Sequence, residues 1–247
     1  MNKIMIRTII RWVFPIKKLQ PIPLRVTTNT NRKSLSMLLF LVSLAFLSAG
    51  TNSLEAQSAD ALLKEVDQKV KSYDNITINF RYGLSNEAEG VNQETRGDVV
   101  LAGDLYKLNL IGTTQLYDGT NIYNISPEDE EVTISPMSDQ DPNAITPSKM
   151  LSFFNEGYTK KMDITQNVQG RPIQYVKLTP MDSNSEVQST LLGIDKQTKH
   201  IYKLIITQKN GTKITITVNS FKTNQPLAKN MFVFDPSKYT DYYINRL

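Results

Sequence analysis

The stretch 97–134 constrains the fold of this chain more than any other part of the sequence. It reads GDVVLAGDLYKLNLIGTTQLYDGTNIYNISPEDEEVTI, in which short runs of Val, Leu, Ile and Tyr alternate with polar residues. Turn-forming residues separate these runs, and Asp118-Gly119 is typical of a tight type I′ hairpin. Parallel strands need much longer crossover connections, so the stretch predicts an antiparallel meander.

Similar patterns occur on both sides of this meander. The stretch 75–84 alternates apolar and polar residues without a break and predicts a half-buried strand, whereas 85–95 is polar and predicts a loop. Further strands are expected at 162–168, 173–179, 187–195, 201–208, 213–221 and 231–234, with a second type I′ turn at Asn210-Gly211. Phe221 is out of phase with Ile214, Ile216 and Val218, which indicates a bulge. We therefore expect a mainly β (α+β) protein in which about eleven strands form one antiparallel sheet that curls into a barrel or half-barrel.

Two helices are expected to cover the apolar face of this sheet. The stretch 58–73 has one apolar stripe, with Ser58 or Asp60 available as a cap. Thr146-Pro147 predicts the start of a second, short helix over 148–155. This second helix carries four large apolar residues in five positions, namely Met150, Leu151, Phe153 and Phe154. One packed face does not need so many, so the helices enclose either a solid core or an apolar cavity.

The distribution of charge argues against nucleic-acid binding. The chain carries 28 basic and 24 acidic residues, a net charge of +4. Residues 1–56 contain eight of the basic residues and one acid, so the remainder has 20 basic and 23 acidic residues, a net charge of −3. Cysteine is absent, which excludes disulfides, thiolate metal sites and a lipid-modified cysteine. The body of the protein is therefore expected to be soluble, with no electrostatic preference for nucleic acid.

The amino-terminal segment has the pattern of an export signal. An apolar run of eleven residues, 37–47, follows Arg32-Lys33 and precedes the small residues Ser48-Ala49-Gly50, with a second candidate cleavage site at Ala56. Such a run is too short to span about 30 Å of hydrocarbon but fits the core of a secretory signal peptide. We expect residues 1–56 to be a signal presequence that is removed, which leaves one domain at 57–247 in the periplasm.

A set of motifs spread along the chain resembles a known family. In order they are Asn79-Phe80-Arg81, Gly97-Asp98-Val99-Val100-Leu101, Leu105-Tyr106-Lys107-Leu108, Tyr117-Asp118-Gly119, Ile122-Tyr123 with Ser126-Pro127, Thr146-Pro147, and Phe232-x-Phe234-x-Pro236. Together they make residues 58–241 similar to the LolA family, the periplasmic carriers of outer-membrane lipoproteins. The resemblance implies an open half-barrel with a helical lid. It also implies lipoprotein cargo, an inner-membrane lipoprotein-releasing ABC transporter that supplies it, and an outer-membrane acceptor.

The resemblance and the alternation of the strands together predict a lipid-binding cavity. Its expected lining is Ile78, Phe80, Tyr82, Val99, Leu101, Tyr106, Leu108, Leu110, Tyr123, Met150, Leu151, Phe153 and Phe154. Proteobacterial members of the family have Arg-Pro before the strand that carries Tyr106, and the Arg bonds to the closed lid. Gly103-Asp104 occupies these positions here. No cofactor and no metal is expected, and the carrier is expected to be a monomer.

An enzyme is not expected from this sequence. His200 is the only histidine, it has no second His to share a metal with, and there is no Ser in the context of a nucleophile elbow. The acidic residues at 128–131, and Asp139 with Asp141, lie among turn residues, as solvated loops do. Two alternatives to the lipoprotein carrier remain open: a lipid- or peptide-sensing envelope regulator, and a carrier of another acylated molecule. In either case the four apolar residues of the second helix would line a pocket, unless they simply fill a core.

Overall fold

The computed structural model describes residues 50–139 and 146–247, with side chains from Ala59 onward except that of Asp139. The first 49 residues of the predicted presequence, and Asp141 of the predicted acidic loop, lie outside the described residues. Within the described ranges, no helix is both long enough and apolar enough to cross a bilayer.

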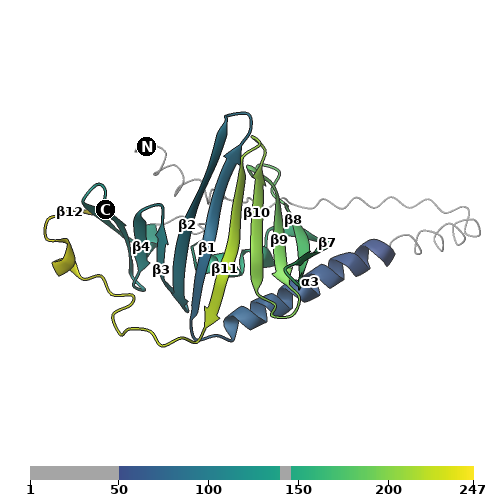
Figure 1. The fold of residues 1–247 in the computed structure, drawn as a ribbon, viewed down its shortest axis with the longest axis horizontal. Coiled ribbons are helices and arrows are strands. Elements are labelled where there is room, and N and C mark those ends of the chain that lie inside the picture. The colour runs from purple at the N-terminus through teal and green to yellow at the C-terminus, as the bar shows by residue number, and fades with distance from the viewer. Residues whose placement is uncertain (1–49, 140–145) are drawn as a thin grey trace, which may run out of the picture.

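A single open sheet of 12 strands forms most of the fold (Figure 1). The strand order is β12-β6-β5-β4-β3-β2-β1-β11-β10-β9-β8-β7, so β12 and β7 are the two free edges and the sheet does not close. The strands are β1 (Ile76–Asn86), β2 (Val91–Ala102), β3 (Leu105–Leu110), β4 (Thr113–Tyr117), β5 (Asn121–Ser126), β6 (Glu131–Pro136), β7 (Tyr158–Val168), β8 (Arg171–Pro180), β9 (Val187–Asp195), β10 (Ile201–Gln208), β11 (Lys213–Thr223) and β12 (Tyr243–Arg246). The expected mainly β fold with a curved antiparallel sheet is confirmed, with one strand more than predicted.

The predicted meander corresponds to β2 through β6, each strand pairing antiparallel with the next. Neither predicted type I′ turn forms, because only the glycines Gly119 and Gly211 have positive φ there and their neighbours Asp118 and Asn210 do not. Instead, the Asp118 carboxylate accepts hydrogen bonds from the backbone N–H groups of Thr120 and Asn121, both at 2.8 Å. This side-chain turn replaces the backbone geometry that the dipeptide favours.

Three other expectations need correction. The predicted loop 85–95 is mostly strand, because β2 pairs with β1 as far as Asn86 opposite Val91, and exposed polar residues can occupy a paired strand. The predicted strand 231–234 is irregular, and the last strand is β12, which pairs parallel with β6. The short helix expected at 148–155 is two 3-10 turns, Lys149–Leu151 and Phe153–Asn155, separated at Ser152 by a φ of −139°.

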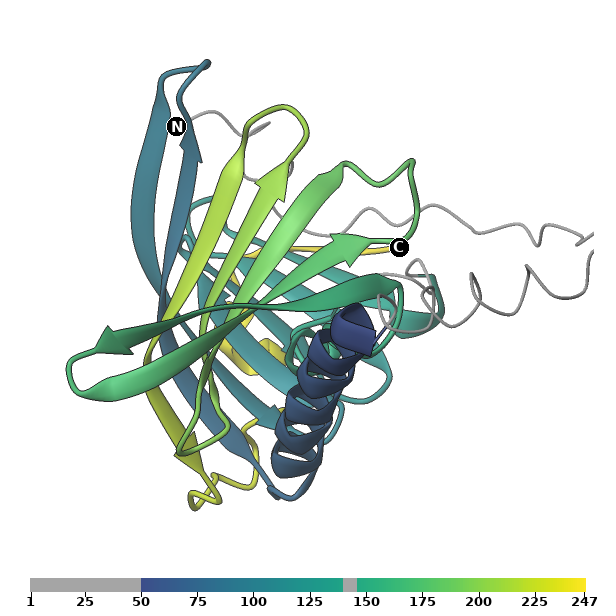
Figure 2. The same cartoon turned by 90° about the vertical axis from the view of Figure 1, so that its right-hand side faces the viewer.

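Helix α3 (Gly50–Lys71) begins before the predicted residue 58 and covers one face of the sheet. Its residues Ala59, Leu63 and Val66 are buried in the core. Figure 2 shows the strands curving past this helix on one side and leaving the other side open. The first hydrophobic core therefore lies between α3 and the face of the sheet that we call the inner face.

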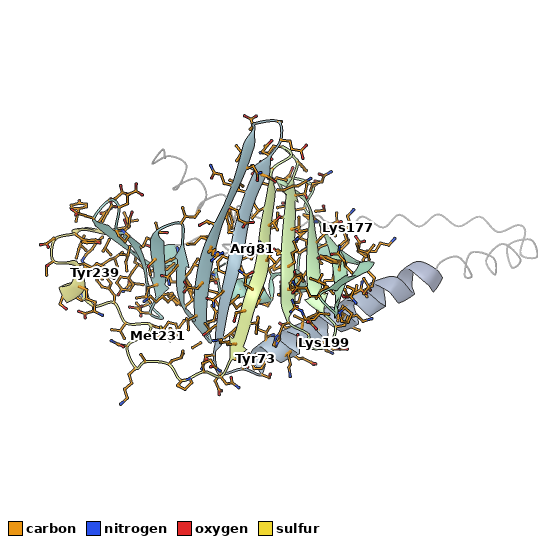
Figure 3. All side chains as sticks on the ribbon, viewed as in Figure 1. Tyr73, Arg81, Lys177, Lys199, Met231 and Tyr239 are labelled. Atoms are coloured by element: carbon orange, nitrogen blue, oxygen red, sulfur yellow. The ribbon has the colours of Figure 1, made fainter. Side chains whose placement is uncertain are left out.

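A second core lies on the opposite, outer face of the sheet. Directly opposed residues on neighbouring strands share a face, and the row Thr77, Val100, Lys107, Leu116 and Tyr123 therefore lies on the face away from α3. The core consists of Leu116, Tyr123, Ile125, Val132 and Ile134, covered by Phe232, Phe234, Tyr239, Tyr242 and Ile244. Figure 3 shows Met231 and Tyr239 on this carboxyl-terminal segment, which runs beside the meander at the end of the molecule far from α3.

The predicted bulge is present where β11 meets β1. Ser220 lies opposite Asn79 and Val218 lies opposite Phe80, so Asn219 is the extra residue. Beyond the bulge, Phe221 lies opposite Ile78 and returns to the inner face. This shift explains why Phe221 is out of phase with the alternating residues before it.

Gly97 allows the Phe80 ring to lie flat across β2. A Cβ at this position would stand 2.6 Å from the Phe80 ring and 2.8 Å from the Asn109 carbonyl oxygen. We therefore expect Gly97→Ala to lower the free energy of unfolding by about 1–3 kcal/mol through overpacking. Gly83→Ala on β1 is the control, because its nearest contacts would be 3.8 Å away. Urea unfolding of both variants checks this, and equal stabilities would contradict it.

Candidate functional site

The inner face near α3 is built by alternate residues of the central strands. Ile78, Phe80 and Tyr82 on β1 point to the core, and their partners on β2 include Val99 opposite Ile78. The same row continues through Leu108 on β3. Because strand residues alternate between faces, the apolar alternation read from the sequence places these side chains together beneath the helix.

The structure brings twelve of the thirteen predicted lining residues into this one core. Eight of them are buried: Ile78, Phe80, Tyr82, Val99, Leu101, Tyr106, Leu151 and Phe154. Leu108, Leu110, Met150 and Phe153 pack against them but remain partly exposed. Tyr123 is the exception. It lies on the outer face, its ring stacks on Phe234 at 4.5 Å, and its hydroxyl donates to the Asp118 carboxylate at 2.7 Å.

The segment 146–155 lies against the inner face although it is not an α-helix. Leu151 and Phe154 are buried, while Met150 and Phe153 are partly exposed. The Phe153 ring contacts Phe154 and Tyr158 edge to face, with centroids 5.8 and 5.7 Å apart. Two short turns rather than one helix let apolar side chains from adjacent positions reach the same core.

Tyr106 marks the point where the inner face becomes polar. It is 1% exposed, and its hydroxyl donates to the Gln115 side chain at 3.0 Å, while Gln115 donates to Asn124 at 2.8 Å. Burial, together with the neighbouring Tyr117, raises the pKa of Tyr106, and burial raises the pKa of Tyr82 to about 12. Both tyrosines are therefore neutral at physiological pH.

Sequence reasoning missed a second wall of this site. Several half-buried apolar side chains on β7, β10 and β11 pack against the same core: Tyr158, Met162, Ile206, Ile216, Val218 and Phe221. Their alternation was visible in the sequence, but it did not reveal that β11 pairs with β1 and so continues the same face. The order of strands in the sheet supplies that information.

Among the described side chains, four polar contacts hold α3, and Tyr73 just after its end, against the rest of the fold. Three of them involve acids on the helix: Asp60 with Lys160 at 2.7 Å, Glu65 with Lys199 at 2.8 Å, and Asp67 with the Asn155 side-chain amide at 2.9 Å. The fourth joins Tyr73 to His200, and Figure 3 shows Tyr73 and Lys199 at the same end of the sheet beside α3. Gly103-Asp104, at the positions where the resemblance places the Arg-Pro of proteobacterial LolA proteins, forms an exposed turn between β2 and β3, with Gly103 at a φ of +58°.

His200 connects the end of α3 to the sheet. Its Nε2 atom is 2.8 Å from the Tyr73 hydroxyl, and its ring stacks on Phe221 with centroids 4.0 Å apart. Burial and the positive charge of Lys69 lower the pKa of His200 below its ordinary value of 6.5, while Asp195 acts in the opposite direction. The ring is therefore a hydrogen-bonded packing group. Among the residues that the structure describes, no three potential metal ligands gather at one place.

The pKa of His200 predicts a loss of stability in acid. The folded protein holds the pKa of His200 below its value in the unfolded chain. The contribution of His200 to the free energy of unfolding is therefore complete above the unfolded pKa and is lost as the pH falls through the folded pKa. We expect the free energy of unfolding to drop between about pH 7.5 and about pH 5, and to drop less in His200→Gln. Urea titrations at both pH values measure this difference. An equal drop in the two proteins would contradict the prediction.

Comparisons with known proteins find one family model and several solved structures similar to this chain. The family model described as "Outer membrane lipoprotein carrier protein LolA" matches residues 112–235. A putative outer membrane lipoprotein-sorting protein domain from Vibrio parahaemolyticus is 14% identical with a TM-score of 0.40, and the match covers 72% of this chain and 97% of that one. The lipoprotein LppX from Mycobacterium tuberculosis is 15% identical with a TM-score of 0.46, covering 70% and 98%. An uncharacterized conserved protein from Thermus thermophilus is 11% identical with a TM-score of 0.48, covering 74% and 98%. No curated protein sequence matches the chain.

Proposed function

The chain belongs to the LolA family of outer membrane lipoprotein carrier proteins, and on that premise we propose that it binds lipoprotein acyl chains against its inner face and carries them from the inner to the outer membrane. Members of this family are binding or carrier proteins rather than enzymes. The proposal includes export of the chain by the predicted presequence, loading in the periplasm by an inner-membrane lipoprotein-releasing ABC transporter, and delivery to an outer-membrane acceptor.

The observation that carries the proposal is the partial exposure of large apolar side chains on the inner face. Leu108, Leu110, Met150, Phe153, Ile216 and Phe221 pack against the core and still contact solvent. Transfer of an acyl chain from water to an apolar surface is favourable by about 0.8 kcal/mol of free energy per CH₂. A sheet with unfilled apolar surface beside a helix can offer acyl chains this environment while the protein itself remains dissolved.

The contacts of α3 suggest how the proposed cargo enters. The helix is held in part by solvent-accessible ion pairs such as Glu65 with Lys199, which contribute little free energy in water. Its apolar stripe, with Leu63 and Val66, packs on the same surface that the acyl chains would occupy. We infer that cargo displaces part of α3, or of the segment 146–155, and takes over these apolar contacts.

Mass spectrometry of the natively purified protein tests the proposed cargo. The protein is isolated from a periplasmic extract without detergent, and its bound molecules are released under denaturing conditions. Co-purifying triacylated or diacylated polypeptides would support the lipoprotein carrier and identify its cargo. Free lipids alone would instead favour a carrier or sensor of small lipids. A protein that is empty and also binds no hydrophobic dye would contradict any acyl-binding function.

A further inference from the structure

The outer face of the sheet carries a pocket of about 570 Å³ beside the β3–β4 turn. Its polar lining consists of Asn79, Arg96, Asp98, Asn109, Thr114 and Asn219. Asn79, Asp98, Asn109 and Thr114 are directly opposed on β1, β2, β3 and β4, so they form one row across four strands about 4.8 Å apart. This row lies on the opposite side of the sheet from the proposed acyl-binding face.

Part of the pocket is held in place by its own hydrogen bonds. The Asn109 side-chain amide donates to the Asp98 carboxylate at 2.8 Å, and the Thr114 hydroxyl donates to the Asn109 side-chain oxygen at 2.7 Å. These bonds fix the planes of the amide and the carboxylate. They leave the second Asp98 oxygen and the second Asn109 N–H available to a ligand.

The remaining polar groups of the pocket have no partner among the described residues. Asn79, Arg96 and Asn219 are exposed, and within the described residues their side chains make no hydrogen bond or ion pair. Arg96 is adjacent to Arg81 on β1, but Arg81 pairs with Glu94 instead. Three unpaired side chains therefore surround a fixed carboxylate, amide and hydroxyl.

Two backbone irregularities meet at the same pocket. Asn219 is the extra residue of the β11 bulge, and bulges commonly redirect a side chain beside a functional site. Ile111 and Gly112 form the β3–β4 turn with φ values of 52° and 71°, both left-handed. A β-branched residue is strained in this conformation, where Asn or Gly is favoured. Ile111 lines the pocket, so a residue with a strained backbone places an apolar side chain at the edge of the pocket.

From this arrangement we propose that the pocket binds a carbohydrate. One Arg and one Asp balance each other, so the site lacks the excess positive charge that a phosphate needs. Asn and Thr side chains both donate and accept hydrogen bonds, and the Asp98 carboxylate accepts them, as the hydroxyl groups of a sugar require. Ile111 offers apolar contact to the C–H face of a sugar ring. The sugar could belong to a soluble saccharide or to a glycolipid headgroup, because both present the same hydroxyl groups.

Saccharide binding by the purified full-length protein tests this proposal. The probes are soluble disaccharides of glucose, mannose, galactose, rhamnose and N-acetylglucosamine, and micelles of a glycolipid with the same headgroup. We expect at least one probe to bind with a dissociation constant of about 1 mM or below. Asn79→Ala and Asn219→Ala should each weaken it about tenfold. Asn92→Ala is the matched control, because Asn92 is an exposed residue of β2 outside the pocket.

A third variant separates binding from folding. Ile111→Asn relieves the left-handed strain, so it should raise the midpoint of thermal unfolding while it weakens sugar binding. Failure of every saccharide and glycolipid to bind would overturn the proposal, as would binding that Asn79→Ala and Asn219→Ala leave unchanged. Capture of a peptide by the same residues would overturn the assigned ligand class. Fatty-acid binding on the inner face should be unaffected in all of these variants, so the two proposals fail independently.

Discussion

Leu108→Glu is expected to weaken fatty-acid binding about 100-fold while the β circular dichroism spectrum stays close to wild type. Leu108 is a half-buried residue of the inner face, on β3 opposite Val99. A carboxylate there must either lie against the acyl chain without water or become protonated, and either costs about 3 kcal/mol. Each 1.4 kcal/mol corresponds to about a tenfold change in affinity. A fluorescent fatty acid titrated into the delipidated protein measures the loss.

Lys107→Glu is the matched control for this experiment. Lys107 is the preceding residue on β3 and lies on the outer face opposite Val100 and Leu116. The variant introduces the same carboxylate on the same strand, so it should bind the fatty acid normally if the acyl chains use the inner face. Normal binding by Leu108→Glu, with its spectrum intact, would rule out that face as the binding site.

The alternation of the strands was enough to predict most of this site from the sequence. Ile78, Phe80 and Tyr82 alternate with polar residues, so one face of β1 was certain to be buried once the stretch was recognised as a strand. The order of the strands came only from the structure. The prediction of a loop at 85–95 was wrong because it rested on the polarity of the residues. The pairing of β1 with β2 depends on backbone hydrogen bonds, which polar residues make equally well.

Tyr123 shows why the other face could not be predicted. In β5, Ile122, Tyr123 and Ile125 are all buried, so apolar residues occupy both faces and alternation does not tell which face Tyr123 takes. The answer depends on what covers the outer face, and that is a segment more than a hundred residues later, around Phe234. Asp67 and Asn155 are 88 residues apart in sequence, so the attachment of α3 was also beyond sequence reasoning.

The second core leads to the other large expected effect, that of Phe234→Ala. The Phe234 ring lies between Tyr123, 4.5 Å away, and Tyr239, 5.3 Å away, and both pairs are stacked. Removing the ring leaves a cavity and breaks both aromatic contacts, which for a partly exposed position should cost about 3 kcal/mol. We expect urea unfolding to show this loss and amide hydrogen exchange to become faster in β4, β5, β6 and β12.

The neighbouring residue provides the control, since the Val233 side chain is 60% exposed and Val233→Ala should leave stability nearly unchanged. Hydrogen exchange also tests whether the two cores are separate. The first core packs α3 against the inner face, with Leu63, Phe80 and Leu192 among its buried residues, and Phe234 is not part of it. Exchange in α3 and β8 to β11 should therefore stay slow in Phe234→Ala, and the inner face should still bind fatty acid. Faster exchange throughout the sheet would instead mean that the carboxyl-terminal segment stabilises the whole fold as one cooperative unit.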